Sequence, residues 1–231
     1  MHKLGLIGGM SWVSTRTYYE QINRIVQRRR DYRSSAPLLI ESLDFARLYA
    51  LQSDADWAGA AAILVDAAQR LEQAGAGALV IGANSMHRVY DEVVAAVDVP
   101  IFHIADCVGE RMSADKVERA ALIGTSNVMT EHFYRRRLIS HGIDLLPPDL
   151  RNVAELDRII YQELMVGRAT RQSERALKSM ITEKEQQGAQ AIVLACTELE
   201  QVVDVDANVL PIYDSTRIHA EYAAEWLLAE G

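Results

Sequence analysis

Short, continuous runs of apolar residues recur along the chain and are separated by stretches with helical periodicity. The runs do not alternate between apolar and polar residues, and this continuity is typical of strands that are covered on both faces. Eight runs are predicted to be strands: 3–9, 37–43, 78–83, 100–104, 119–125, 143–147, 191–196 and 210–214.

The segments between the runs predict helices. Residues 57–74 place apolar side chains at helical spacing, and Gly75 follows as a stop signal. A second helix is predicted over about 172–187 and is stopped by Gly188. Alternation of strands and helices is typical of βαβ units with parallel sheets, so we expect an α/β protein.

The two halves of the chain repeat one pattern. Three pairs of segments match at nearly constant offsets of 116, 113 and 111 residues: 4–11 with 120–127, 74–85 with 187–198, and 99–106 with 210–217. Any two βα units resemble each other to some degree, but here order and spacing both hold, which favours a duplication. We therefore predict two pseudo-symmetric Rossmann-like domains with parallel sheets, the first over 1–104 plus 208–231 and the second over 105–207.

The chain is acidic, with a net charge of −8 and a sequence pI of about 5.3. Binding to nucleic acid or to a membrane surface needs a basic face, so neither partner is expected. Arg28, Arg29 and Arg30 form a basic run that is predicted to be the solvated end of a helix. No apolar run approaches the roughly 20 residues that span a bilayer, so no membrane segment is expected.

The chain has two cysteines, Cys107 and Cys196. Their number and spacing form neither a disulfide framework nor a metal motif, so we expect a reducing, cytoplasmic setting and no bound metal. The segment GLIGGMS lacks the third glycine of a dinucleotide motif, and the sequence contains no P-loop. No cofactor is therefore expected.

Small polar residues follow four of the predicted strands: GGMS at 8–11, ANS at 83–85, GTSN at 124–127 and CTE at 196–198. Ligands of parallel sheets bind at the carboxyl ends of the strands, and the helix N-termini that follow bind carboxylates through free N–H groups. We predict a site for a small anion between the two halves, with positions 83 and 196 on opposite sides of it.

Cys196 is the candidate catalytic residue. At a strand end before a helix, its thiolate would be stabilised by the helix dipole. The alternative role, a small core residue, fits Cys107 better, because the polar residues Thr197 and Glu198 follow Cys196 at once. A thiol on each face of an amino acid can remove the Cα proton from one side and return it on the other. Such two-base racemisation needs no cofactor.

Several motifs are jointly distinctive: GLIGGMSW (5–12), SLDF (42–45) followed by Gln52, ANSMH (83–87), HIAD (103–106), LIGT (122–125), ACTE (195–198) and LPIYDSTRIHAE (210–221). Through them the chain resembles the aspartate/glutamate racemase family over essentially its whole length. The resemblance implies a PLP-independent amino-acid racemase with two Rossmann-like domains, one catalytic residue from each, no cofactor and a homodimeric assembly. It implies aspartate, glutamate, a wider set of amino acids or a related carboxylate as the substrate.

The resemblance also assigns site residues. The second catalytic residue falls on Cys196, and the first, usually Cys or Thr, falls on Ala83. The residues implied to bind the carboxylate or to line the rest of the site are Asn84, Ser85, Thr197, Met10, Ser11, Gln52, Thr125 and Ser126. Met165 stands where some aspartate racemases bring a lysine into the site. Arg47 and Arg168 are the alternatives for binding a side-chain carboxylate, although both fit surface charges better.

Ala83 departs from the family pattern, because alanine has no exchangeable proton. Three explanations are open: an engineered replacement of Cys or Thr, a natural one-thiol reaction of the arylmalonate decarboxylase type, or an acid supplied by Ser85 or by water. We favour the first. Ser85 fits a helix cap better than a base, because an unassisted alkoxide is costly. A non-catalytic amino-acid-binding protein is a further alternative, ranked last because of Cys196.

Three histidines, His87, His103 and His219, are predicted to be structural hydrogen-bonding residues. No two of them have the spacing of metal ligands. Glu198 is expected either to orient Cys196 or to cap the helix that follows it.

Overall fold

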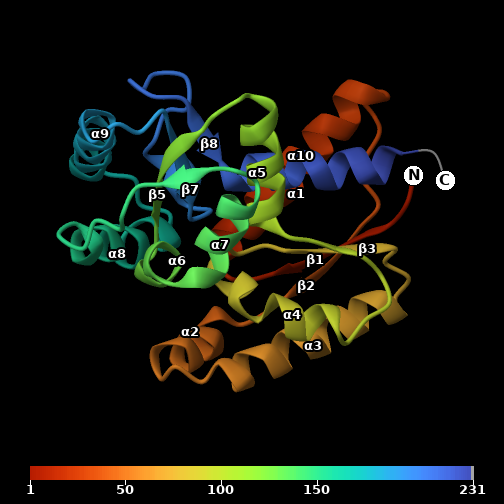
Figure 1. The fold of residues 1–231 in the computed structure, drawn as a ribbon. Helices are drawn as coiled ribbons and strands as arrows, with labels where there is room; N and C mark the ends of the chain where they lie inside the picture. The colour runs from red at the N-terminus through yellow and green to blue at the C-terminus, as the bar shows by residue number, and fades with distance from the viewer. Residues whose placement is uncertain (230–231) are drawn as a thin grey trace. The chain divides into compact units, whose positions relative to one another are not determined.

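The computed structural model describes residues 1–229 and divides into two compact units. The first unit comprises Met1–His103 with His219–Gly231, and the second comprises Ile104–Ile218. Each unit is built on a parallel four-stranded sheet with helices packed on it. Figure 1 shows the strands of each sheet and the helices beside them.

The sheet of the first unit has the strand order β2-β1-β3-β4. Its strands are β1 (Leu4–Gly8), β2 (Leu38–Ser42), β3 (Ala78–Ile81) and β4 (Ile101–Phe102). The helices before the crossing to the second unit are α1 (Trp12–Arg29), α2 (Phe45–Ser53), α3 (Trp57–Gln73), the 3₁₀ helix η1 (Ser85–Val89) and α4 (Tyr90–Val94).

Both faces of this sheet are covered, which explains why its strands read as continuous apolar runs. Side chains alternate along a strand, so Leu4 and Leu6 of β1 pack on one face while Ile7 packs on the other. The first face is covered by α1 and by α10 (Ser215–Leu228), and the second by α3.

The sheet of the second unit has the strand order β6-β5-β7-β8. Its strands are β5 (Arg119–Gly124), β6 (Asp144–Leu145), β7 (Ala191–Ala195) and β8 (Ile212–Asp214). Its other elements before α10 are α5 (Ile104–Ala114), α6 (Ser126–Thr130), α7 (His132–Ser140), α8 (Val153–Gln162), η2 (Leu164–Val166), α9 (Arg171–Gln186) and η3 (Leu199–Gln201). Apolar residues of α8 and α9 pack against alternate residues of β5 and β7.

The predicted α/β fold with two parallel sheets is confirmed. All eight predicted strands are present, and α3 and α9 occupy the two segments predicted to be helical. Gly75 and Gly188 follow these helices with φ values of 90°, as expected of stop signals. Both sheets connect their strands in the same order, in agreement with a duplication. Within residues 1–229 no helix combines the length and the apolar composition that a membrane span requires.

The boundary at which the chain returns from the second unit to the first was predicted too early, at residue 208. Residues 208–218, predicted to belong to the first domain, lie in the second unit, and the return comes at His219. The reason is that β8 pairs in parallel with β7, with Ile192 opposite Ile212 and Leu194 opposite Asp214. Helix α10 therefore begins in the second unit and continues into the first.

Candidate active site

The polar segments after β1, β3, β5 and β7 lie at the carboxyl edges of the two sheets. Only β1 is followed at once by a long helix, the 18-residue α1. The segments after β3, β5 and β7 enter η1, α6 and η3, which have five, five and three residues. Short helices align few peptide groups, although η1 continues directly into α4. That the helix N-termini at these strand ends bind an anion stays a prediction.

Hydrogen bonds fix the segment between β1 and α1. The backbone N–H of Gly9 donates to Oγ1 of Thr15 at 2.7 Å, and that hydroxyl donates to the carbonyl of Ser11 at 2.9 Å. The hydroxyl of Ser14 donates to the carbonyl of Gly82 at 3.0 Å. This last contact joins the first turn of α1 to the end of the neighbouring strand β3, so the two strand ends of the first unit are held together.

Two predicted site residues lie in this loop. Met10 is 2% exposed and packs in the apolar core beneath the edge. Ser11 is buried and caps α1, where its hydroxyl accepts from the N–H of Ser14. Gln52, a further predicted site residue of this unit, is half-buried on α2.

The end of β3 holds a buried amide that has no protein partner. Asn84 is 4% exposed, and neither Oδ1 nor Nδ2 has a hydrogen-bond partner among residues 1–229. A buried side-chain amide without partners is costly, and a site that binds a polar ligand explains it. Ser85 is half-buried, and its hydroxyl does not cap η1, so the cap predicted for it is absent there.

Ala83 precedes this amide and is 4% exposed within the apolar core of the first unit. Its carbonyl is 2.8 Å from Nδ1 of His87. The imidazole ring of His87 lies 4.6 Å from that of His103 and 5.8 Å from that of His219, centroid to centroid. The three histidine rings thus pack against one another, and His87 contacts the end of β3.

His219 is a structural residue, as predicted. Its Nδ1 lies 2.7 Å from the hydroxyl of Tyr18, and its Nε2 lies 3.1 Å from the carbonyl of Phe102. Burial, together with the neighbouring His87, lowers the pKa of His219 to about 3. The ring is therefore neutral at physiological pH and serves as a fixed hydrogen-bonding group.

Cys196 lies at the end of β7 beside a buried carboxylate. The thiol is 5% exposed and is a free cysteine. Its Sγ donates to Oε2 of Glu198 at 3.2 Å, and the hydroxyl of Thr197 donates to the same oxygen at 2.7 Å. Glu198 itself is 1% exposed. Of the two roles considered for Glu198, the contact with Cys196 is present, and no helix cap by its side chain is found at η3.

The thiol of Cys196 is held in its protonated form. Burial raises the pKa of this thiol well above its usual value of 9.0, and the negative charge of Glu198 adds to the effect. The sequence had predicted a stabilised thiolate, and that prediction is wrong because burial and the carboxylate outweigh the short turn after β7. Cys107, on α5, is also buried, and its pKa is raised to about 12. The resting thiol of Cys196 is thus a proton donor, with Glu198 in place to accept its proton.

A titration tests this assignment. In native protein labelled with ¹³C at the cysteine Cβ, we expect no titration of Cys196 below pH 9, because its pKa lies above the usual 9.0. Replacing Glu198 with Gln is expected to lower the midpoint of Cys196, since it removes a negative charge 3.2 Å from the sulfur. The signal of Cys107 in the same spectra and a Glu200→Gln variant are the controls. An unchanged midpoint in Glu198→Gln would contradict the assignment.

Two of the remaining predicted site residues, Thr125 and Ser126, follow β5. Thr125 is 5% exposed after β5, and the register that pairs Gly124 with Ala195 places Thr125 next to Cys196. Ser126 is half-buried, and its backbone N–H donates to Asp157 at 3.0 Å, so this N–H is not free to bind an anion.

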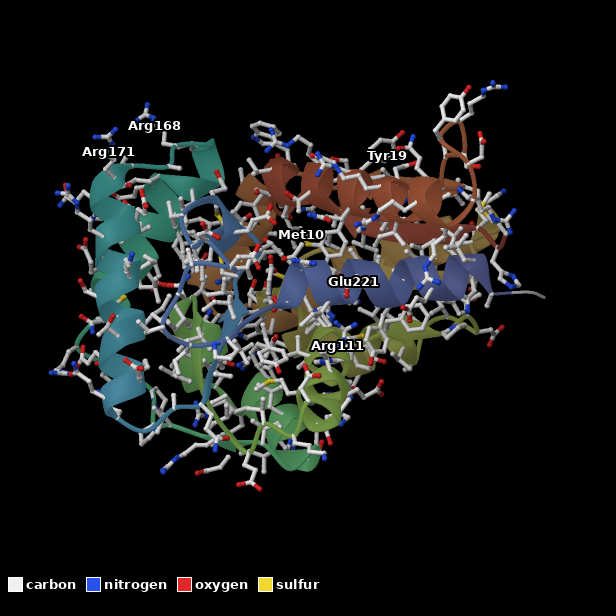
Figure 2. All side chains as sticks on the ribbon, turned by 90° about the horizontal axis from the view of Figure 1, so that it is seen from above. Met10, Tyr19, Arg111, Arg168, Arg171 and Glu221 are labelled. Atoms are coloured by element: carbon white, nitrogen blue, oxygen red, sulfur yellow. The ribbon has the colours of Figure 1, made fainter. Side chains whose placement is uncertain are left out.

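Three residues were considered for binding a side-chain carboxylate. Met165 is half-buried, whereas Arg47 and Arg168 are exposed. Figure 2 shows the side chain of Arg168 extending outward near that of Arg171.

The structure thus groups the candidate residues by unit. Met10, Ser11, Ala83, Asn84 and Ser85 follow the adjacent strands β1 and β3 of the first unit. The members from the second unit, which follow the adjacent strands β5 and β7, are Thr125, Ser126, Cys196 and Thr197. That positions 83 and 196 address the same substrate stays a prediction. In the part of the chain covered by the structure, no group of three His, Cys, Asp or Glu residues is arranged to hold a metal ion.

Comparison with known proteins identifies similar chains. The family model described as Asp/Glu/Hydantoin racemase matches residues 7–223. The Broad specificity amino-acid racemase RacX of Bacillus subtilis (strain 168) is 27% identical over 168 residues, which are 72% of this chain and 71% of that protein.

Solved structures agree with this match. A candidate Asp/Glu racemase from Yersinia pestis is 39% identical with a TM-score of 0.91, over 99% of this chain and 100% of that one. An aspartate racemase homologue from Pyrococcus horikoshii OT3 is 31% identical with a TM-score of 0.84, again over 99% and 100% of the two chains.

Proposed function

Because the chain belongs to the Asp/Glu/hydantoin racemase family, we propose that it moves a proton at the Cα of an amino acid, with Cys196 as an acid/base group and without a cofactor. One observation carries this proposal: the buried thiol of Cys196 is hydrogen-bonded to the buried carboxylate of Glu198. The position that corresponds to Cys196 in the first half of the chain is Ala83, which has no proton to give.

The proposed reaction begins when the thiol proton of Cys196 passes to Glu198 and leaves a thiolate. The thiolate removes the proton from Cα, the C–H bond breaks, and its electron pair moves into the substrate carboxylate. The free amide of Asn84 is a candidate group for binding the carboxylate. In a two-base racemase a second acid protonates the opposite face. Here Ala83 supplies none, so we propose that Cys196 returns a proton mainly to the face from which it came.

The substrate class follows from the same observations. The relative in Bacillus subtilis is named a broad specificity racemase. Among residues 1–229, the three side chains considered for binding a second carboxylate form no dedicated clamp, since Arg47 and Arg168 are exposed and Met165 is apolar. We therefore propose amino acids of several side-chain types, aspartate and glutamate included, as substrates.

Exchange of the Cα proton with deuterium from heavy water tests the proposal. We expect loss of the Cα proton signal from at least one enantiomer of an amino-acid panel, with the configuration retained. In Cys196→Ala the rate is expected to fall at least about 100-fold, the usual effect of removing an acid/base group. Cys107→Ala, which removes the other cysteine, is the control and is expected to exchange at the parent rate. No exchange of any amino acid, either by this chain or by its Ala83→Cys variant, would refute the proposal.

A decarboxylase is the second candidate function. The thiol of Cys196 is protonated, and the side chain of Ala83 has no exchangeable proton. Both features suit a reaction in which one thiol protonates the carbanion left by loss of carbon dioxide. Release of carbon dioxide from substituted malonates that is lost in Cys196→Ala would favour this candidate. Ligand-induced stabilisation by amino acids that survives Cys196→Ala, without turnover, would instead favour a binding protein.

A further inference from the structure

Four buried hydroxyl groups of the second unit have no hydrogen-bond partner within residues 1–229: those of Thr125, Tyr134, Ser215 and Thr216. The two threonines are Thr125, which is 5% exposed, and Thr216, which is fully buried. Native proteins pair nearly all buried polar atoms, so an unpaired hydroxyl calls for an explanation such as a catalytic role or a bound molecule. Thr125 belongs to the predicted site, whereas Thr216 does not.

Both threonines follow strands that are paired with β7, the strand that ends at the catalytic candidate. Strand order places β5 on one side of β7 and β8 on the other. Gly124 of β5 is opposite Ala195 of β7, so Thr125 and Cys196 are each the next residue beyond a registered pair.

On the other side of β7, the last registered pair with β8 comes one residue earlier along β7. Leu194 of β7 is opposite Asp214 of β8, so Cys196 and Thr216 are each the second residue beyond a registered pair. The carboxylate of Asp214 accepts from the backbone N–H of Thr216 at 2.9 Å and fixes the start of α10 there. Neighbouring strands lie about 4.8 Å apart, so the segments that follow β5 and β8 lie on either side of the segment that follows β7. Thr216 is the second residue of α10, directly after β8.

The repeated half of the chain shows that the fold does not require these hydroxyls. At the three offsets found in the sequence, the corresponding positions of the first copy of the repeat are Gly9, Ala83 and Ala105. None of them carries a hydroxyl or a thiol, although the strand order is the same. Hydroxyl and thiol groups at these three positions are thus confined to the second copy of the repeat, where they belong to Thr125, Cys196 and Thr216.

We infer that Thr216 contacts the substrate carboxylate and that its hydroxyl, with that of Thr125, stabilises the charge that develops there. The inference rests on the proposed function. When the Cα–H bond breaks, the proton goes to the sulfur of Cys196 and the electron pair goes to the carboxylate oxygens. Hydroxyl donors in a buried site stabilise that charge more strongly in the transition state than in the ground state, so they lower the barrier.

Substitution of Thr216 by Val separates this role from a structural one. Valine has nearly the shape of threonine and lacks only the hydroxyl. If the hydroxyl is unpaired in the free protein, its removal relieves a buried unsatisfied group, so the melting temperature is expected to stay equal or to rise. A hydroxyl with a structural partner would give the opposite result.

The experiment compares the parent chain with Thr216→Val, Thr216→Ser and the control Thr182→Val, whose hydroxyl is on the exposed face of α9. For Thr216→Val we expect deuterium exchange to fall about tenfold or more in kcat. We also expect the stabilisation by added malonate to be lost, while the melting temperature without malonate does not fall. Thr216→Ser is expected to restore exchange, and Thr182→Val to leave exchange and malonate stabilisation as in the parent.

A lower melting temperature for Thr216→Val, with exchange and malonate stabilisation unchanged, would overturn the inference and leave the proposed function intact. Absence of exchange in both the parent chain and its Ala83→Cys variant would refute the proposed function, and the malonate measurement would then decide the role of Thr216 alone. If neither chain exchanges and malonate does not stabilise the parent, both are overturned.

Discussion

Replacing Ala83 with Cys is expected to raise the rate of racemisation by about 10²- to 10⁴-fold, the range that a well-placed acid/base group contributes. The reason is the asymmetry between the two halves of the chain. Cys196 supplies a thiol at one strand end, and Ala83 occupies the corresponding position with a methyl group. The end of β3 has a further polar group available for a ligand, since the amide of Asn84, next to Ala83, is buried and has no hydrogen-bond partner within residues 1–229.

Chiral chromatography of the amino acid over time measures this gain, and proton exchange in heavy water is followed in parallel. Ala83→Ser is the matched control, because a serine hydroxyl is a far weaker acid than a thiol and should give little racemisation. The double variant Ala83→Cys with Cys196→Ala should lose the gain. Racemisation that persists in the double variant would show that the two positions do not act together.

Gly9→Ala is expected to destabilise the protein by more than about 3 kcal/mol, or to prevent folding. Gly9 has a φ of 82°, in the region that disfavours side chains. In addition, a Cβ at this position would collide with the backbone oxygen and nitrogen of Leu43, closer than any real contact. Relief would require the β1–α1 loop to move, but the hydrogen bond from Gly9 to Thr15 holds it.

Gly142→Ala is the matched control for this substitution. Gly142 has a φ of 84°, but a Cβ there would have no neighbour within 4 Å. The control therefore carries the backbone strain without the collision, and we expect it to cost about 1 kcal/mol. Urea unfolding of the two variants measures the difference. Equal losses of unfolding free energy would contradict a collision with Leu43.

The fold could be predicted from the sequence because its strands are covered on both faces. That burial leaves continuous apolar runs, and the duplication makes each run recognisable twice. The domain boundary could not be predicted equally well. The run at 210–214 could be identified as a strand, but its place beside β7 depends on pairing between distant segments, which local pattern does not contain.

The candidate site was predictable in its residue types and less so in its chemistry. The position of Cys196 at a strand end followed from the repeat, but the protonation of its thiol depends on burial and on the distance to Glu198. The sequence did not point to Thr216 as a candidate substrate contact, because a threonine beside Asp214 at a helix start resembles part of an ordinary helix cap. The comparison of Thr216 with Ala105 across the repeat was the signal that could have identified it.

The path of α10 has a consequence for the order in which the protein assembles. The first unit needs α10 for its core, because Ala220, Ala223 and Leu227 pack on the same face of the sheet as Leu4 and Leu6. A chain is synthesised from its amino end, and domains fold as units as they become complete. The whole of Ile104–Ile218 is therefore available to fold before α10 emerges. The unit whose strands are made first is the last to close its core. Until then α1 alone covers that face of the sheet, and the part that α10 covers stays accessible to the chaperones and proteases of the cell.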